Sequence, residues 1–586
     1  MALLKKNILN FLYYLLVVAG SVAMLVPALK LRAADLRVPF QYEFDVVWLL
    51  TAIKGVLAHG TFLTDPNCGL PGVMQLYEYP SSDYLHWALI RLIGLWAHSP
   101  ALTMNLFYLL TFPLTALLAV IVFRKLGLSA LTAFVLGLLY TFLPYHIFRN
   151  VGHLFLSTYY MVPCGMLLVI RMLQGRLDYW PVEPAGTPPS TRTTWLMVVL
   201  AVLVAASGAY YGFFTCLLLG VVAVLRMVRL RQVRPLFNAA IPVALMLLTV
   251  GVSISPMFWY QHKYGKNPAA VIRGRNGETY GLKITQLLIP VTNHRIHALA
   301  ALKDVYNQKA PLVNENSSAT LGIVGSIGFL VLLGIALFAL RVSPAFTDLA
   351  LLNLSAVLFT TIGGLGAVLT LIGFTWIRSY NRISVFISFM SLLAVGMLIE
   401  QWRVRWSPAV TAVLLIGLLC IGLLDEIPRF DPTGYAVTKA EFQRDRDFVT
   451  RAEAGLPAKA MVFQLPYIPF PENPKPVNHI DYAYDHFRGY LHSRQLRWSF
   501  GAMRGRPVDL WQQQVSALPT PQLLTEVTRA GFDGLYLNRD GYADGGKQLE
   551  REITGILGHP AFAVSADGKL VMYRMTEYRL KTAGLP

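Results

Sequence analysis

Hydrophobic runs long enough to cross a lipid bilayer recur through the first three quarters of the chain. A hydrocarbon core about 30 Å thick needs roughly 20 apolar residues of helix, and eleven runs approach that length. They are residues 8–29, 101–123, 128–145, 154–173, 195–209, 211–228, 237–257, 319–340, 348–373, 383–400 and 408–424. The pattern predicts an α-helical polytopic membrane protein with about eleven transmembrane helices.

The hydrophobic pattern changes after residue 424. The apolar runs become short, and three of them alternate as strands do, at 460–467, 533–539 and 569–575. Helical spacing is predicted at 438–454 and 520–530. Residues 425–586 are therefore expected to form a small α/β domain, which is long enough to fold by itself.

Basic residues at the ends of the runs predict the orientation, because Lys and Arg in short loops are retained on the cytoplasmic side. The first run has no small-residue cleavage site and is expected to remain as an anchor. If every run crosses once, the basic residues on one side are Lys5, Lys6, Arg124, Lys125, Arg226, Arg229, Arg231, Arg234, Arg341, Arg403 and Arg405. The N-terminus is then cytoplasmic, and segments 31–100, 258–318 and 425–586 lie outside. A re-entrant unit at 195–228 would reverse the side of the C-terminal domain.

Composition supports a membrane protein and limits the classes of ligand. The chain is 55% hydrophobic and only 14% charged, with mean hydropathy +0.50. The net charge of +18 is explained largely by the cytoplasmic flanks, so no nucleic-acid partner is predicted. Some basic residues fall on the outer side instead and favour an anionic ligand such as a phosphate: Arg149, Lys263, Lys266, Arg273, Arg275, Arg378 and Arg382.

The first outer segment carries acidic residues at a predicted helix start. Val46 to His59 has helical apolar spacing but is too short to span, which favours a helix lying along the membrane interface. Glu43 and Asp45 fall at its beginning, where carboxylates favour the helix dipole. The alternative is a general base at the bilayer surface, with Asp45 preferred over Glu43.

Further along this segment, "YEYPSSDYLHW" contains Asp83 and His86, three residues apart and on one helical face. The pair suits acid/base chemistry or a metal ion with oxygen ligands. Alternatively, Asp83 caps the next helix and the aromatic residues belong to an interfacial belt.

Polar residues also mark the outer ends of three spans. In "LPYHIFRNVGH", a continuous helix would direct His146, Arg149 and His153 the same way, although snorkelling to the interface is an alternative. "SGAYYGFF" places Tyr210 and Tyr211 near an outer end, as belt or pocket residues. "IRSYNR" separates two arginines by four positions, so that both guanidinium groups share a face suited to a phosphate.

These features together resemble the GT-C superfamily of polytopic glycosyltransferases, and most closely its YfhO-like bacterial branches. The resemblance rests on the acidic residues soon after the first run ("YEFD"), on "YEYPSSDYLHW", "LPYHIFRNVGH" and "IRSYNR", and on a C-terminal outer domain. Many members carry an adjacent acidic pair in the first loop, whereas Phe44 separates Glu43 from Asp45 here. On an extended backbone these two carboxylates would share a face.

The resemblance implies transfer of a sugar from a polyprenyl-phosphate donor to a glycan or lipid acceptor at the outer face of a bacterial cytoplasmic membrane, with inversion. Asp45 would be the base that deprotonates the acceptor. The donor phosphate would be bound by Arg378, Arg382 and Arg149, and the pocket would include Asp83, His86, His146, His153, Tyr210 and Tyr211. The transfer is either metal-assisted, with a divalent cation, or metal-free. A different class, a flippase or transporter of lipid-linked saccharides, predicts inverted repeats and mid-span charges, and no convincing repeat is visible.

Two further segments have two interpretations each. Residues 484–506 are rich in Tyr, Trp, His and Arg, which suits either sugar binding or packing of the C-terminal domain onto the membrane part. Segment 258–318 is expected to be either a loop that closes over the donor or a solvated connector.

Overall fold

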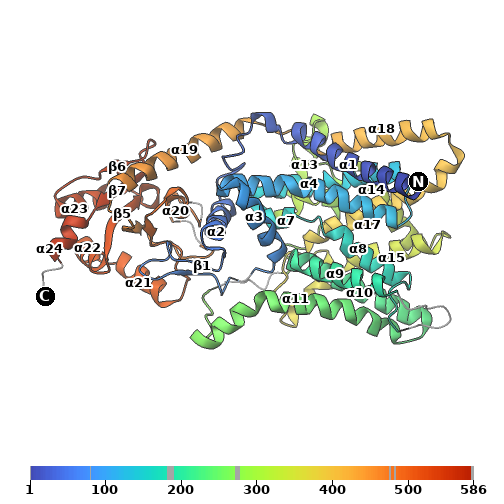
Figure 1. Ribbon diagram of the computed structural model, residues 1–586, viewed down its shortest axis with the longest axis horizontal. Coiled ribbons are helices and arrows are strands. Elements are labelled where there is room, and N and C mark those ends of the chain that lie inside the picture. Colours follow the sequence, from blue (N-terminus) through green and yellow to red (C-terminus); the bar gives the residue numbers. More distant parts are fainter. Residues whose placement is uncertain are drawn as a thin grey trace.

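A helical bundle and a smaller α/β domain lie end to end in the computed structural model (Figure 1), which describes residues 2–79, 81–180, 190–270, 277–473, 477–480 and 483–582. Each of the eleven predicted runs coincides with a helix of the bundle. These helices are α1 (Ala2–Ala28), α4 (Pro100–Lys125), α5 (Ala130–Thr141), α8 (Val162–Leu173), α9 (Thr191–Ala206), α10 (Ala209–Leu230), α11 (Arg234–Tyr264), α14 (Gly322–Phe338), α15 (Pro344–Thr360), α17 (Ser384–Trp402) and α18 (Pro408–Glu426). The polytopic helical fold is confirmed.

Within the described residues, eight helical segments are long and apolar enough to cross a membrane, and three shorter apolar helices accompany them, namely α9, α14 and α15. The number of spans therefore stays a prediction. The N-terminus and the C-terminal domain lie at opposite ends of the bundle (Figure 1), as an odd number of crossings requires. Which end faces the cytoplasm also stays a prediction.

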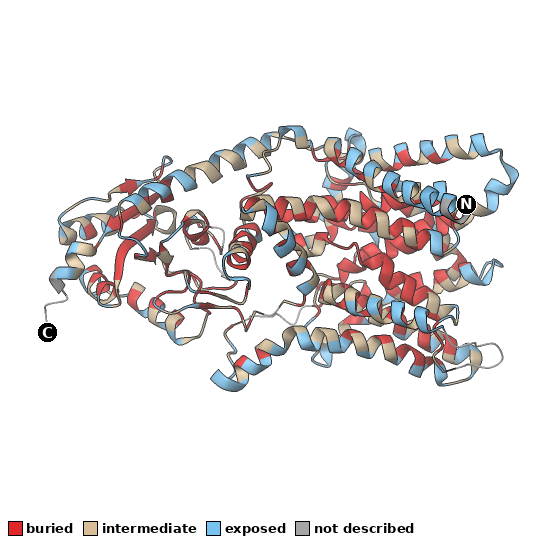
Figure 2. Cartoon of the chain, viewed as in Figure 1, coloured by how far each residue is buried: buried red, intermediate tan, exposed pale blue. Residues whose placement is uncertain are grey.

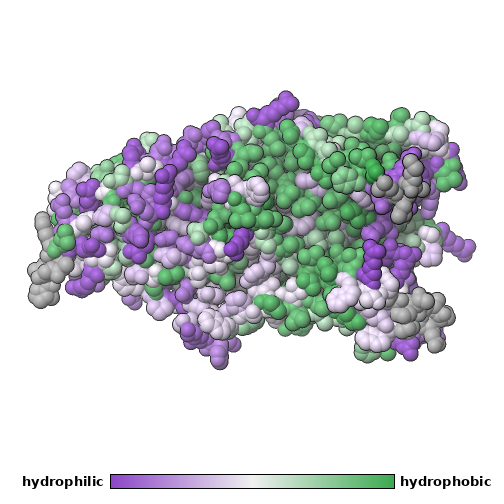
Figure 3. All heavy atoms as spheres, viewed as in Figure 1, coloured by the Kyte–Doolittle hydropathy of each residue, from purple (hydrophilic) through white to green (hydrophobic). Residues whose placement is uncertain are grey.

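The surface of the bundle is predominantly hydrophobic on its sides. Figure 3 shows hydrophobic residues over the bundle, with hydrophilic residues over the α/β domain and at the opposite end of the bundle. Buried residues concentrate in the middle of the bundle (Figure 2), whereas α1 and α18 expose most of their apolar side chains. This distribution is that of a multi-pass membrane protein, in which lipid solvates the exposed apolar faces.

The C-terminal domain is built on a five-stranded sheet of order β4-β3-β5-β7-β6. The strands are β3 (Met461–Leu465), β4 (Arg497–Trp498), β5 (Phe532–Asn538), β6 (Ala563–Val564) and β7 (Leu570–Arg574). Strands β4, β3 and β5 are parallel, and β7 joins β5 and β6 antiparallel. All seven residues of β5 are buried, as expected of a central strand. The three predicted strands are confirmed as β3, β5 and β7.

Helices cover this sheet and connect it to the bundle. They are α19 (Thr433–Ala454), α20 (Phe487–His492), α21 (Pro507–Ser516), α22 (Thr520–Arg529), α23 (Lys547–Leu557) and α24 (Thr576–Thr582), with a short 3₁₀ turn η6 (Arg539–Gly541). Helix α19 extends from the bundle to the sheet (Figure 1). The predicted helices 438–454 and 520–530 are thus confirmed as parts of α19 and α22.

Segment 31–100 folds into η1 (Leu31–Ala33), α2 (Asp45–His59), β1 (Thr64–Asp65), β2 (Met74–Gln75) and α3 (Tyr84–Ala97). The predicted helix at 46–59 is present as α2. Its apolar residues pack against α4 and α20, and the C-terminal domain folds over this helix. Its place along the membrane interface stays a prediction.

Residues 484–506 hold the C-terminal domain on segment 31–100. The Arg506 guanidinium binds the Glu78 carboxylate at 2.5 Å, and Lys54 Nζ donates to the Ser493 carbonyl at 2.5 Å. Trp498 is fully buried. These contacts support the packing interpretation of this stretch.

Segment 258–318 is described except for residues 271–276. It contains the end of α11, α12 (Ile284–Leu288), α13 (His297–Lys309) and η3 (Asn314–Ser318). Lys263 lies over the Trp259 ring at 5.5 Å, and Arg273 and Arg275 lie outside the described residues. The remaining short elements are α6 (Pro144–Arg149), η2 (Val151–His153), α7 (Leu154–Ser157), α16 (Gly366–Leu371), η4 (Tyr380–Ile383) and η5 (Arg403–Arg405).

Candidate functional site

One carboxylate, Glu315 on η3, joins two arginines that are far apart in the sequence. Its Oε2 lies 2.9 Å from Arg149 Nη2 and 3.5 Å from Arg382 Nη2. The Arg382 guanidinium stacks on the Tyr210 ring at 4.0 Å, and that of Arg149 lies over the Tyr145 ring at 5.3 Å. Salt bridges and aromatic faces therefore fix both cations in place.

Helix ends position this cluster. Arg149 is the last residue of α6, Arg382 lies in η4 immediately before α17, and Tyr210 is the second residue of α10. The first peptide N–H groups of a helix have no intrahelical partner and carry partial positive charge. The beginnings of α10 and α17 therefore add to the positive potential of the two arginines, which favours an anion at this place.

The cluster keeps capacity for such an anion. Burial acts to raise the pKa of Glu315, but Arg382 and Arg149, helped by His153, hold it below its ordinary value. The ionised Glu315 carboxylate balances only one of the two guanidinium charges, so the three side chains together keep one positive charge. Nε of Arg149 and Nε of Arg382 are buried without a hydrogen-bond partner among the described residues. Buried donors of this kind are normally satisfied.

Asp45 is a further carboxylate near this cluster, and it interacts electrostatically with Glu315. It is the first residue of α2, and the preceding Phe44 adopts φ 48°, an uncommon backbone conformation for a non-glycine residue. The side chain is accessible to solvent, yet the surrounding protein displaces enough water to raise its pKa to about 6, with Glu472 and Glu315 adding to the effect. Such a carboxylate is ionised at neutral pH and basic enough to accept a proton.

An aromatic cavity of about 330 Å³ adjoins Asp45 and the Arg149–Glu315–Arg382 cluster. Among the described residues, its aromatic lining consists of Trp48, Phe62, Tyr79, Trp87, Phe155, Tyr210 and Trp376. Its charged lining consists of Asp83, Arg378 and Glu472. Tyr210 belongs to the cavity and to the Arg382 stack, and Glu472 interacts electrostatically with Asp45, so the cavity and the charged cluster form one site.

Arg378 and Arg382 both reach this site, but not from one helical face. Residues 374–379 form no helix, and η4 begins only at Tyr380. Arg378 lines the cavity and lies over the Tyr280 ring at 5.6 Å, while Arg382 stacks on Tyr210. The expected helical geometry was wrong, although Arg378 lines the same cavity as Tyr210, the ring on which Arg382 stacks.

Asp83 stands immediately before α3 and His86 lies in its first turn, and Asp83 Oδ1 is 3.9 Å from His86 Nδ1, so the two side chains share one face as predicted. Asp83 lines the cavity, accepts a hydrogen bond from Ser81 Oγ at 2.8 Å, and has its pKa raised to about 6 by burial. It stands at the N-cap position but makes no capping hydrogen bond. His86 is fully buried among aromatic rings behind the cavity, and burial lowers its pKa to about 3. His86 is therefore a neutral packing residue.

His146, Arg149 and His153 do not share a helical face. The chain turns sharply at Asn150, which has φ 31°, between α6 and η2. His146 is fully buried, stacks on Phe112 with ring centroids 3.7 Å apart, and hydrogen-bonds to Thr111 at 2.8 Å. The prediction of a common direction was wrong because the helix is broken, and of the two histidines only His153 lies beside Glu315.

The two members of the pair Tyr210 and Tyr211 have different surroundings, and so do Glu43 and Asp45. Tyr210 lines the cavity, whereas Tyr211 is buried and donates its hydroxyl to the Leu156 carbonyl. Glu43 lines another cavity, of about 380 Å³, together with Gln41. Residues 42–45 are not an extended strand, and Asp45 is not among the residues that line this cavity.

Two site residues were missed by sequence reasoning. Glu315 lies in a segment where attention fell on the basic residues, and its signal was an acidic side chain just before the run at 319–340. Glu472 comes from the C-terminal domain and follows a Pro-rich stretch with no local sign of chemistry. Only the folding of that domain onto α2 brings it beside Asp45.

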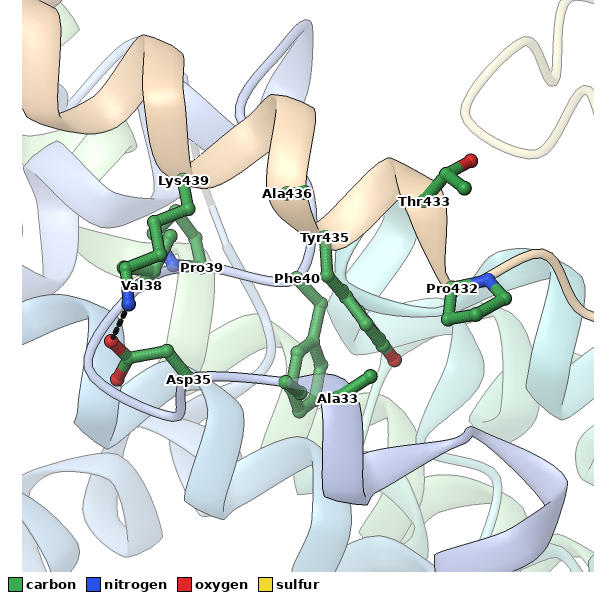
Figure 4. A pocket seen from close by; sticks show the side chains of 11 residues that line it. Ala33, Asp35, Val38, Pro39, Phe40, Pro432, Thr433, Tyr435, Ala436 and Lys439 are labelled. Carbon is green, nitrogen blue, oxygen red and sulfur yellow. Dashed lines mark hydrogen bonds and ion pairs between the residues drawn. The ribbon is translucent and has the colours of Figure 1, made fainter.

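Within the described part of the chain, no group of three or more His, Cys, Asp or Glu side chains is placed to hold a metal ion. A cavity of about 450 Å³ lies between the end of α1 and the start of α19 (Figure 4), where Phe40 packs near Tyr435 and the Lys439 ammonium pairs with Asp35 at 2.9 Å. Its one ion pair is already satisfied.

Comparisons with known proteins gave matches among solved structures only. No family model and no curated protein matches the chain. The arabinofuranosyltransferase AftD from Mycobacteria is 15% identical over 90% of this chain and 35% of its own, with a TM-score of 0.46. The oligosaccharyltransferase AglB from Archaeoglobus fulgidus, in complex with an inhibitory peptide and a dolichol-phosphate, is 10% identical over 96% of this chain and 74% of its own, with a TM-score of 0.44. This chain thus spans about a third of AftD, 35%.

Proposed function

We propose that this chain is a membrane glycosyltransferase of the GT-C type, which transfers a sugar from a polyprenyl-phosphate donor to an acceptor hydroxyl at the outer face of a bacterial cytoplasmic membrane. The observation that carries the proposal is the juxtaposition of Asp45, with its raised pKa, and the Arg149–Glu315–Arg382 cluster. Enzymes that transfer acyl or phosphoryl groups also combine a base with cationic side chains, but the aromatic cavity beside the cluster suits a sugar.

In the proposed reaction, Asp45 is the base and the donor phosphate is the leaving group, and both belong to one site. Asp45 accepts the proton of the acceptor hydroxyl while that oxygen forms a bond to the anomeric carbon of the donor sugar. The bond from the anomeric carbon to the phosphate oxygen breaks, and its electron pair leaves with the phosphate. Attack from the face opposite the phosphate inverts the anomeric configuration.

The arginines stabilise the charge that develops on the phosphate. Arg149 and Arg382 are held rigidly by Glu315, so little reorganisation is needed when the negative charge grows. Arg378 reaches the same space from the cavity wall. Guanidinium groups suit this task because their planar donors match two phosphate oxygens at once.

The location of the site fits a lipid-borne donor. The site lies at the ends of α6, α10 and α17, where the bundle meets the C-terminal domain. A polyprenyl chain would be solvated by lipid along the hydrophobic side of the bundle while its phosphate enters the arginine cluster. The predicted cytoplasmic N-terminus then places this end of the bundle outside.

The decisive experiment uses purified full-length protein in lipid nanodiscs with radiolabelled polyprenyl-phosphate sugars and a panel of acceptors. Asp45→Asn is expected to abolish transfer, whereas Asp304→Asn, the same change at an exposed position of α13, retains it. Transfer by Asp45→Asn at the normal rate would remove this residue from the mechanism. In proteoliposomes, label that changes leaflet without reaching any acceptor would favour the transporter instead.

A further inference from the structure

Two cavities follow one face of α19, and among the described residues neither shares a lining residue with the aromatic cavity. The first, of about 380 Å³, includes Glu43 and Asn150 in its lining, and the second, of about 230 Å³, lies on the C-terminal domain. Glu441 lines both cavities. Thr438 and Arg444, one helical turn to either side of Glu441, line the first and the second cavity respectively. The two spaces therefore follow one another along the helix.

The first cavity begins next to the reacting groups. Consecutive Cα atoms are 3.8 Å apart, so Glu43 lies within about 7 Å of Asp45 along the backbone, and Asn150 adjoins Arg149. Of the described residues, none lines both this cavity and the aromatic cavity that contains Arg378. The first cavity is therefore a space separate from the aromatic cavity, and its lining includes the chain neighbours of Asp45 and Arg149.

The lining of the first cavity has the chemistry of a site for a neutral polyol. Aromatic rings are supplied by Phe40, Tyr42, Tyr108, Phe430 and Tyr435, and hydrogen-bonding groups by Gln41, Glu43, Asn150, Thr433, Thr438 and Glu441. Amide and carboxylate groups bind pairs of neighbouring hydroxyls, because each offers two polar positions in one plane. Among the described residues, no Lys or Arg lines this cavity, which disfavours a phosphate there.

The second cavity is more polar, and its cations are already paired. Arg444 binds Asp567 at 2.8 Å, and Lys569 Nζ binds Asp540 at 2.6 Å. The Arg488 guanidinium binds Asp485 at 3.1 Å. These pairs hold planar donors and acceptors in fixed positions without an excess of positive charge. The cavity also lies at the carboxyl end of β5, the usual place for ligands in open α/β sheets.

We propose that the two cavities form one groove that binds the acceptor as a neutral saccharide chain, with its reacting end beside Asp45 and the following sugar units on the C-terminal domain. This inference rests on the proposed function, since the groove supplies the acceptor of that reaction. It assigns the C-terminal domain a role in selecting acceptors by length.

The test uses full-length protein in nanodiscs and neutral di- and hexasaccharides of glucose, galactose, mannose and arabinose in several linkages. Thr438→Trp fills the first cavity, and Ala440→Trp places the same side chain at an exposed position of α19 outside both cavities. Saturation-transfer NMR is expected to detect at least one hexasaccharide on wild-type protein and on Ala440→Trp. Thr438→Trp is expected to weaken that binding by about tenfold or more.

Binding also separates this inference from the proposed function, because it requires no transfer. Asp45→Asn should bind the hexasaccharide as wild-type protein does, and Glu441→Ala should weaken hexasaccharide binding more than disaccharide binding. The groove is refuted if no neutral saccharide binds, or if Thr438→Trp and Ala440→Trp bind equally well. Asp45-dependent transfer to a lipid or peptide, with no saccharide bound, would refute the groove while leaving the transferase intact.

Discussion

The pH dependence of transfer tests the assignment of Asp45 most directly. A general base works only when ionised, so kcat/KM should follow the ionised fraction of this carboxylate. With a pKa of about 6, about nine tenths of the side chains are ionised near pH 7 and only about one tenth near pH 5. Transfer should therefore fall about tenfold for each pH unit below 6, whereas an aspartate of ordinary pKa would keep its full rate at pH 5.

The environment of Asp45 supplies a second perturbation. Glu472 lies in the cavity wall, and its negative charge helps to raise the pKa of Asp45. Glu472→Gln should move the acid limb of the profile to lower pH, since less electrostatic work is then needed to ionise the base. Two other titrating groups lie close by, Asp83 and His153, so Asp83→Asn and His153→Gln serve as controls that keep the limb near pH 6.

The assay measures initial rates of transfer of radiolabelled sugar between about pH 4.5 and pH 8, at subsaturating donor and with the same lipid composition throughout. Circular dichroism at each pH excludes unfolding as the cause of the limb. A wild-type limb near pH 4, or a limb that disappears in His153→Gln, would refute the identification of Asp45 as the base.

Three further results are expected. Asp45→Asn should raise the thermal stability at pH 7 and leave it unchanged near pH 4, because the folded pKa of Asp45 lies above its unfolded value and ionisation therefore costs stability as pH rises through about 4 to 6; equal melting temperatures at pH 7 would contradict this. Glu315→Gln should leave two buried guanidinium groups without their carboxylate, so inorganic phosphate should raise its melting temperature more than that of wild-type protein in differential scanning fluorimetry. Arg488→Met should destabilise the docked C-terminal domain by about 1–3 kcal/mol, because it removes one of the two arginine partners of the buried Asp445 and the partner of the half-buried Asp485. Accelerated proteolysis between the bundle and the domain would report that loss, and unchanged cleavage would contradict it.

The sequence alone determined the architecture of this protein. Each predicted hydrophobic run coincides with a helix, because about 20 consecutive apolar residues have few alternatives to a helix in a membrane. The α/β character of the C-terminal domain followed from the change in period after residue 424. Hydrophobic periodicity depends only on residues that are close in sequence, so it can be interpreted without knowing the tertiary structure.

Tertiary structure decided which polar residues form the site. A broken helix at Asn150 separates His146 from His153, and an irregular turn at Phe44 separates Glu43 from Asp45. Both predictions assumed regular backbone between residues close in sequence, and a single unusual φ angle defeats that assumption. Glu315 and Glu472 reach Asp45 from distant segments, because salt bridges and the folding of the C-terminal domain over α2 bring them there. Spacing along a chain does not encode such contacts, so the bundle was predictable from its residues and the arrangement of charges around Asp45 was not.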